Sequence, residues 1–150
     1  MTASEQWVLQ FCHSYDGPFL DCARQYAALF VGTPYKVCTV YLTGAPDEEV
    51  VQGSASDEVI FLDYRSRDVR GLKLRAVRDI RKIAATRKFS FCIAHRFKPI
   101  YVALIGTSLP VIGVHHAFGD YQRRPRQLFA NFYRKRLTLL GVSDAVRDDI

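Results

Sequence analysis

Short apolar runs alternate with amphipathic segments along the whole 150-residue chain. The apolar runs are rich in Val, Ile, Leu and Phe, as is typical of strands that are buried on both faces of a sheet. We predict six strands, at residues 7–12, 35–43, 59–62, 89–94, 110–114 and 137–142. Strands that alternate with helices form βαβ units, so the pattern predicts an α/β, Rossmann-like three-layer sandwich, with helices on both faces of a mostly parallel sheet.

Helical periodicity fills most of the gaps between these strands. Helices are expected at residues 18–32, 65–88, 99–107 and 121–136, and from Ser143 onward. The first helix follows Asp16 and Gly17 with Pro18 in its first turn, and it carries one apolar stripe. The stripe consists of Phe19, Cys22, Ala23, Tyr26, Ala27 and Phe30. Residues 44–57 are acidic and rich in Gly, Pro and Ser, which predicts a mobile surface loop.

The length fits one domain, and the cysteines indicate a reducing compartment. Cys12, Cys38 and Cys92 lie inside apolar runs and no Cys-x-x-Cys pair is present, so we expect small, buried, reduced thiols. The N-terminus has no basic region followed by an apolar core, and no apolar stretch approaches the ~20 residues that cross a bilayer. We therefore expect a cytoplasmic protein.

The net charge of +6 conceals two halves of opposite sign. Residues 1–64 contain two basic and nine acidic residues, giving −7, whereas residues 65–150 contain nineteen basic and six acidic residues, giving +13. Two interpretations of the basic helices are open. Their charged faces are solvated, with the aliphatic parts of the Lys and Arg side chains lying over the sheet, or they form a surface that binds anionic lipid or another polyanion. The candidate membrane-facing residues are Arg75, Arg78, Lys82, Arg123, Arg124 and Arg126. In the segment 121–136, the aromatics Phe129, Phe132 and Tyr133 enter the core in the first case and a lipid interface in the second.

Histidines mark the ends of two predicted strands. His95 follows residues 89–94, and His115 and His116 follow residues 110–114. The carboxyl ends of neighbouring parallel strands form one edge, where open α/β sheets bind ligands. Gly17 follows the first strand, where a glycine turn exposes the amides of a helix N-terminus to an anion. The alternatives are histidines satisfied in the core and a merely structural turn.

Several kinds of chemistry are disfavoured by the spacing of the residues. There is no Gly-x-Gly-x-x-Gly fingerprint for a dinucleotide. No Gly-x-Ser-x-Gly motif is present either, and Ser14, Ser90 and Ser108 have no evident base, which argues against a hydrolase. The histidines are not spaced for ligation from one helix and no thiolate is expected near them, so no metal site is expected.

Together with Gly17 and His95, two further features resemble the N-terminal domain of GT-B glycosyltransferases of family four. Pro110 precedes a strand and His116 lies six positions after it, and the chain ends in Leu-Gly-Val-Ser-Asp-Ala-Val-Arg-Asp-Asp-Ile at residues 140–150. The stretch His-Arg-Phe-Lys-Pro at residues 95–99 is similar to one in bacterial members that build the lipopolysaccharide core. The resemblance covers nearly the whole chain, through short motifs.

The resemblance implies that residues 1–150 are the acceptor-side domain and that the C-terminal donor domain lies outside this chain. The family's paired glutamates, seven residues apart, have no match here. Members often have two glycines where Asp16 and Gly17 stand, and His115 is an additional neighbour. By the resemblance, His116 contacts the transferred sugar and Gly17 the donor phosphate, while the anionic acceptor meets His95, Arg96, Lys98 and His115.

The resemblance thus implies transfer of a hexose, with retention, from a nucleotide-sugar to a lipid-linked glycan. No cofactor, metal or nucleic acid is expected, the location is the inner face of the cytoplasmic membrane, and the isolated domain is expected to be inactive. The alternatives are a basic α/β module that binds nucleic acid or anionic membrane without catalysis, and a free-standing domain for a nucleotide or another phosphorylated ligand.

Overall fold

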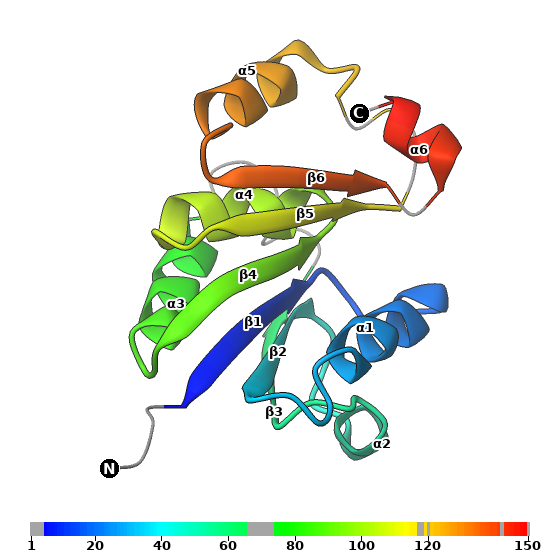
Figure 1. Ribbon diagram of the computed structural model, residues 1–150, viewed down its shortest axis with the longest axis vertical. Helices are drawn as coiled ribbons and strands as arrows, with labels where there is room; N and C mark the ends of the chain where they lie inside the picture. Colours follow the sequence, from blue (N-terminus) through cyan, green and yellow to red (C-terminus); the bar gives the residue numbers. More distant parts are fainter. Residues whose placement is uncertain (1–4, 66–73, 117–118, 120, 142, 150) are drawn as a thin grey trace.

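A six-stranded sheet forms the centre of the protein in the computed structural model, which describes residues 5–65, 74–116, 119, 121–141 and 143–149 (Figure 1). All neighbouring strands are parallel and their order is β3-β2-β1-β4-β5-β6. The strands are β1 (Gln6–Cys12), β2 (Tyr35–Thr43), β3 (Glu58–Tyr64), β4 (Phe89–His95), β5 (Val111–His115) and β6 (Leu137–Gly141). The predicted Rossmann-like α/β class, with its six strands, is confirmed.

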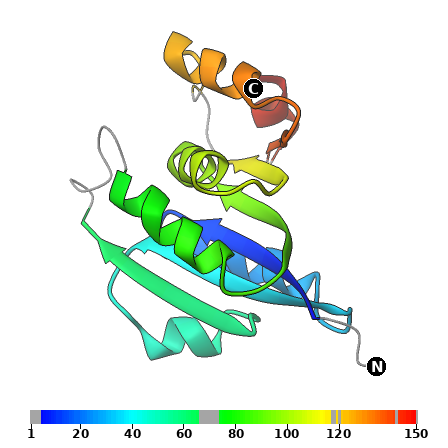
Figure 2. The same cartoon turned by 90° about the vertical axis from the view of Figure 1, so that its left-hand side faces the viewer.

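Helices cover both faces of the sheet (Figures 1 and 2). They are α1 (Pro18–Ala28), α2 (Glu48–Gln52), α3 (Leu74–Ala84), α4 (Phe97–Gly106), α5 (Arg124–Phe132) and α6 (Asp144–Asp149). Helices α1 and α2 pack on one face, through Ala23, Ala27 and Val50. Helices α3 and α4 pack on the other face, where α5 adds Phe129. Among the described residues, no helix is long and apolar enough to cross a membrane.

Alternation along the strands divides the core between the two faces. In β1, Leu9 and Phe11 face α3 and α4, while Val8 faces α1. The larger cluster lies under α3 and α4, which cross so closely that a Cβ on Gly106 would collide with Ile80. Because successive side chains of a strand point to opposite faces of the sheet, the face on which each polar residue at a strand end lies is also fixed.

The helix predicted at residues 65–88 is shorter than expected at its C-terminal end. Helix α3 ends at Ala84, and the hydroxyl of Thr86 donates a hydrogen bond to the carbonyl of Ile83 at 2.7 Å. Arg87 lies beyond the end of the helix. Its guanidinium carbon is 4.6 Å from the ring centroid of Trp7, and its side chain forms an ion pair with Glu58. Arg65 is not helical, and residues 66–73 lie outside the described part of the chain.

The stretch predicted as a loop at residues 44–57 contains the short helix α2. Its N-cap is Asp47, whose carboxylate accepts hydrogen bonds from the backbone N–H groups of Glu49 and Val50. Val50 is buried against α1 and β2. The prediction of a mobile surface loop is therefore wrong for Glu48–Gln52, because capping and one buried side chain stabilise a turn of helix in an otherwise polar sequence.

Two other predicted helices are shorter than expected, although their orientations follow the sequence. Helix α1 ends at Ala28 instead of Gly32, and its apolar stripe faces the sheet through Ala23 and Ala27. Helix α5 covers only Arg124–Phe132. Of its aromatic residues, one enters the core and one is exposed, so neither interpretation of this segment holds for both. Phe129 packs on Tyr101, with ring centroids 4.9 Å apart, whereas Phe132 is 80% exposed.

Candidate functional site

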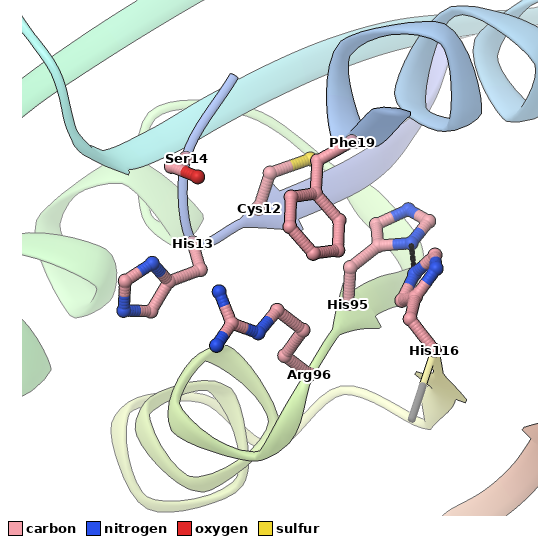
Figure 3. A pocket seen from close by; sticks show the side chains of 7 residues that line it. All are labelled: Cys12, His13, Ser14, Phe19, His95, Arg96 and His116. Carbon is pink, nitrogen blue, oxygen red and sulfur yellow. Dashed lines mark hydrogen bonds between the residues drawn. The ribbon is translucent and has the colours of Figure 1, made fainter. Parts of the chain in front are cut away.

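The candidate site lies where the strand order reverses. The chain leaves β1 for β2 on one side, while β4 lies on the other side of β1, and this arrangement opens a crevice at the carboxyl ends of β1 and β4. A small pocket is found there, which we call the histidine pocket (Figure 3). It is lined by Cys12, His13, Ser14, Phe19, His95, Arg96 and His116.

His95 and His116 meet in this pocket, as the sequence predicted. His95 ends β4 and pairs in register with Val114 of β5, so His116, two residues later, projects to the same face of the sheet. His95 Nδ1 lies 3.1 Å from His116 Nε2, and the two rings lie side by side (Figure 3). The expected convergence of polar side chains from adjacent strand ends is confirmed.

Gln10, a buried residue of β1, fixes the protonation of this pair. The Gln10 amide donates to the Ala23 carbonyl and to Thr39 Oγ1, both at 3.1 Å, which orients its Oε1 toward His95 Nε2 at 2.8 Å. His95 Nε2–H must therefore donate to Gln10, its Nδ1 is an acceptor, and His116 donates through Nε2–H, an assignment that follows from the hydrogen-bond network. Burial and the neighbouring His116 lower the pKa of His95 to about 3, so the ring is neutral at pH 7.

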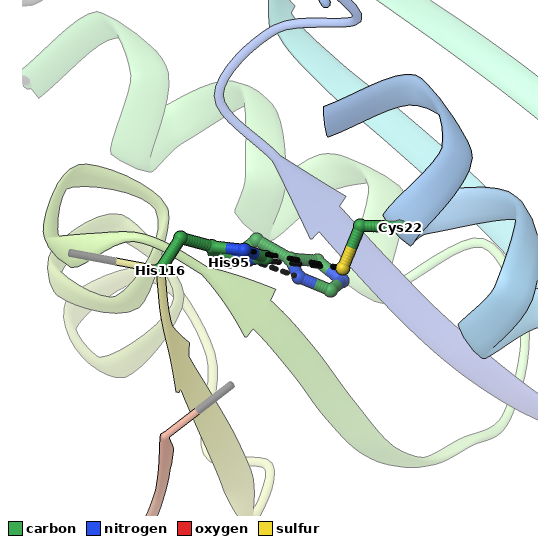
Figure 4. A group of neighbouring side chains, drawn as sticks. All are labelled: Cys22, His95 and His116. Carbon is green, nitrogen blue, oxygen red and sulfur yellow. Dashed lines mark hydrogen bonds between the residues drawn. The ribbon is translucent and has the colours of Figure 1, made fainter. Parts of the chain in front are cut away.

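Cys22 of α1 completes this group (Figure 4). Its Sγ lies 3.9 Å and 4.0 Å from the two ring nitrogens of His116, and the ligand atoms of Cys22, His95 and His116 all lie within 4.8 Å of one another. The expectation that no thiolate lies near the histidines is therefore corrected, because the Cys22 thiol lies beside them. Cys22 belongs to the apolar stripe of α1, and only the packing of that helix on β4 and β5 brings it to His116.

Arg96 enters the site in an unusual backbone conformation. Its φ of 70° and ψ of 164° lie in a region that is essentially restricted to glycine and costs of order 1–3 kcal/mol for other residues. Its N–H donates to the Val114 carbonyl at 2.9 Å, and its guanidinium lies 5.1 Å from the ring centroid of Phe19. Arg96 thus contributes a cation to the lining of the pocket, and strained residues of this kind cluster at ligand sites.

A second hollow, which we call the cationic hollow, adjoins the histidine pocket. It encloses about 60 Å³ and is lined by His13, Arg96, Phe97, Lys98 and Arg126. Arg126 lies 4.5 Å from the ring centroid of Phe97. Burial, followed by the charges of Arg96 and Lys98, lowers the pKa of His13 to about 4. Three cations around one hollow favour a small anion such as a phosphate group.

Gly17 occupies the turn that the sequence indicated. It is the N-cap of α1, with φ 54° and ψ −132°, a conformation that favours glycine. A Cβ built there would find nothing within 4 Å, so the turn opens away from the packed core. Its contact with a donor phosphate stays a prediction.

The structure does not bring His115 into the histidine pocket. As the neighbour of His116 along an extended chain, it projects to the opposite face of the sheet. It is completely buried, its Nε2 lies 2.9 Å from the Tyr121 hydroxyl, and the two rings are 4.9 Å apart. His115 therefore has the character of a satisfied core histidine, and its ring is not accessible to an acceptor at the strand edge.

The predicted membrane-facing cations separate into two groups. Arg75, Arg78 and Lys82 are exposed on α3, and Arg123 and Arg124 are exposed at the start of α5. Arg126 is instead partly buried over Phe97 in the cationic hollow. Contact of these residues with a membrane stays a prediction.

The size of the histidine pocket limits what this chain can bind alone. The free space is about 10 Å³. A single water needs roughly 10–15 Å³ on the same measure, so a hexose does not fit inside. The pocket is therefore one wall of any sugar site, not an enclosed binding cavity.

The fold and the position of the pocket define a Rossmann-like α/β domain with a ligand crevice at its strand-order reversal. No protein-family profile matches the sequence, and no curated protein matches it either. Among solved structures, the chain is similar to Phytolacca americana UGT2, a GT-B glycosyltransferase solved with UDP-2fluoro-glucose and pterostilbene. The TM-score is 0.53 at 12% identity, over 73% of this chain and 30% of UGT2. This similarity establishes a shared fold with part of a glycosyltransferase.

Proposed function

We propose that this chain is the acceptor-side lobe of a GT-B glycosyltransferase that takes a hexose from a nucleotide-sugar. The observation that carries the proposal is the pairing of His95 with His116 beside the Gly17 turn, at the crevice of a fold shared with UGT2. The small free space fits this proposal, because a lobe of such an enzyme supplies only one wall of the cleft. The donor lobe would then lie outside these 150 residues, and this chain alone would be inactive.

His116 is the residue that we assign to the transferred sugar. With Nε2–H donating to His95, its Nδ1 is the acceptor nitrogen; it lies 3.9 Å from the Cys22 thiol, a weak donor that a sugar hydroxyl would replace. Gln10 and His95 act as positioning residues, because they hold the His116 ring in one tautomer. The backbone of Gly17, at the start of α1, would meet the donor phosphate, whose charge a helix N-terminus favours without a metal ion.

For the acceptor we propose an anionic, lipid-linked glycan of the lipopolysaccharide type. The support is the cationic hollow, where Arg96 and Lys98 stand next to the histidine pocket and Arg126 adds a third cation. The exposed arginines of α3 and α5 would then lie on anionic lipid at the inner face of the cytoplasmic membrane. Transfer with retention is part of the same proposal and follows from the family resemblance alone.

Turnover of the natural protein that contains this chain tests the proposal, with nucleotide-sugar donors and a phosphorylated glycolipid acceptor. His116→Ala should lower kcat at least ~10-fold, the low end of what one transition-state contact contributes. His116→Gln is the matched variant, since its amide can still donate to His95 while the imidazole is lost. Both variants should keep the wild-type melting temperature to within a few degrees. Undiminished turnover in His116→Ala would remove this residue from the site.

The acceptor is tested separately from the donor. Exchange of Lys98 for Gln should raise the KM for a phosphorylated acceptor and leave the KM for its dephosphorylated form unchanged. The matched control is Arg134→Gln, which removes an exposed cation outside the hollow. An equal effect of Lys98→Gln on both acceptors would contradict the anion assignment.

A further inference from the structure

We propose that Cys22, His95 and His116 form a zinc site with three protein ligands. The three side chains come from α1, the end of β4 and the residue after β5, and they converge at the edge of the histidine pocket (Figure 4). One thiolate and two imidazoles form a ligand set that Zn²⁺ commonly takes in proteins. This inference goes beyond sugar transfer, because it concerns a ligand that the proposed reaction does not need.

Two of the three distances between the ligand atoms are close to those of a tetrahedral zinc site. Zn–N bonds of 2.0–2.1 Å and a Zn–S bond of 2.3 Å place two nitrogens ~3.3 Å apart and sulfur ~3.6 Å from each nitrogen. Here the facing nitrogens of His95 and His116 are 3.1 Å apart, and Cys22 Sγ lies 4.0 Å from His116 Nε2, the nitrogen that faces His95. All three ligand atoms lie within 4.8 Å of one another, so shifts of up to ~1 Å, within reach of side-chain rotation, would bring them to one ion.

The surroundings of His95 resemble the outer shell of a metal site. A metal-ligating histidine usually donates its second ring N–H to an oxygen, which fixes the ring and raises its basicity. His95 donates Nε2–H to Gln10 Oε1 at 2.8 Å, and this leaves Nδ1 facing His116. Gln10 is itself held by Ala23 and Thr39 and is 1% exposed, so this support is rigid.

Zinc binding has a defined proton balance. The Cys22 thiol loses its proton to solvent and forms the Zn–S bond, although partial burial raises its pKa, because a coordinating thiol is deprotonated by the ion. The His116 ring proton moves from Nε2 to Nδ1, so that both facing nitrogens bind through lone pairs. One proton is therefore released for each ion bound.

The site is open on one side. His116 and Cys22 are both partly exposed, and the histidine pocket beside them has room for about one water molecule, which suits a fourth ligand. Zinc would also engage the ring that we assign to the sugar. The ion is therefore expected to inhibit transfer reversibly.

Titration of the 150-residue chain, first freed of metal with a chelator, tests the site without any sugar substrate. Co²⁺ is the spectroscopic probe, because thiolate ligation gives a sulfur-to-metal charge-transfer band, and Zn²⁺ should displace it. Cys22→Ser should abolish this band and weaken Zn²⁺ binding by more than ~10-fold. Cys38→Ala, which removes a buried thiol on the other face of the sheet, should leave both unchanged.

The outer shell gives a second, independent measurement. Gln10→Ala should weaken Zn²⁺ binding 10–100-fold while the Co²⁺ charge-transfer band remains, the range expected for loss of a partner that orients a ligand. Calorimetry in buffers of different ionisation enthalpy should show one proton released per ion by the wild type. Each variant's metal-free melting temperature shows whether it is folded.

Three results would overturn the zinc site: no Zn²⁺ binding by the folded wild type, equal affinity in Cys22→Ser, or a charge-transfer band that Cys38→Ala removes. Failure of sugar transfer is a separate outcome, because these titrations contain no donor or acceptor. Conversely, a chelated enzyme that transfers sugar but binds no zinc would support the proposed function and refute this inference.

Discussion

Acidification should destabilise the protein through His95, whose ring is neutral in the folded state. Burial lowers its pKa from 6.5 to about 3. Below pH 6.5 the unfolded chain therefore takes up a proton at His95 that the folded chain does not. The stability that this ring contributes is fully present above pH 6.5 and is lost as the pH falls toward 3.

The magnitude follows from the same pKa difference. Each pH unit in this window costs about 1.4 kcal/mol for one proton, so a change from pH 8 to pH 5 should lower the free energy of unfolding by about 2 kcal/mol. The pKa of His13 is lowered to about 4, so this ring also lowers the free energy of unfolding on acidification. Its contribution is smaller, because the ring is only half-buried. Comparison with a His95 variant separates the two.

Urea unfolding followed by the fluorescence of Trp7, the single tryptophan, measures this effect. The experiment needs a chelator, so that metal binding does not contribute. His95→Gln keeps an amide near Gln10 and cannot titrate. It should be less stable than the wild type at pH 8, and its loss between pH 8 and pH 5 should be smaller by about 2 kcal/mol. Parallel stability curves for the two proteins would refute the assignment of a buried, neutral His95.

Three further predictions concern the backbone and the charged surface. Arg96→Gly should be more stable than Arg96→Ala by about 1 kcal/mol or more in urea unfolding, because only glycine relieves the positive φ, and an Ala variant of equal stability would contradict the strain. Gly141→Ala should lower stability by about 1–3 kcal/mol, since its Cβ would meet backbone atoms of α6, whereas Gly53→Ala, whose Cβ would meet only the Glu49 carbonyl oxygen at 3.4 Å, should change stability little. Replacement of Arg123 and Arg124 by Gln should weaken co-sedimentation with anionic vesicles ~30-fold, at about 1 kcal/mol per cation, while Arg24→Gln should not. Steeply salt-dependent binding to DNA, with no binding to vesicles, would instead favour the nucleic-acid alternative.

The positions of the strands and the edge that carries the chemistry were predictable from local sequence. An apolar run with β-branched residues, such as residues 110–114, predicts a buried strand from the local sequence alone. The rule that parallel strands end at a common edge then placed His95 near His116, and the contact of 3.1 Å confirms it. The end of α3 was less predictable. Arg87 lies outside the helix because it contacts Trp7 of β1 and Glu58 of β3, and helical periodicity does not encode these partners.

The set of partners around the histidines depends on the fold of the whole domain. Gln10 reaches His95 across 85 positions of sequence, and Cys22 reaches His116 across 94. In the sequence, nothing distinguishes Gln10 from the other residues of its strand, and nothing distinguishes Cys22 from the other residues of the apolar stripe. Their roles depend on strand order and on the face to which each side chain projects, and these are fixed by packing between distant segments, whereas helix and strand periodicity is fixed by residues adjacent in the chain.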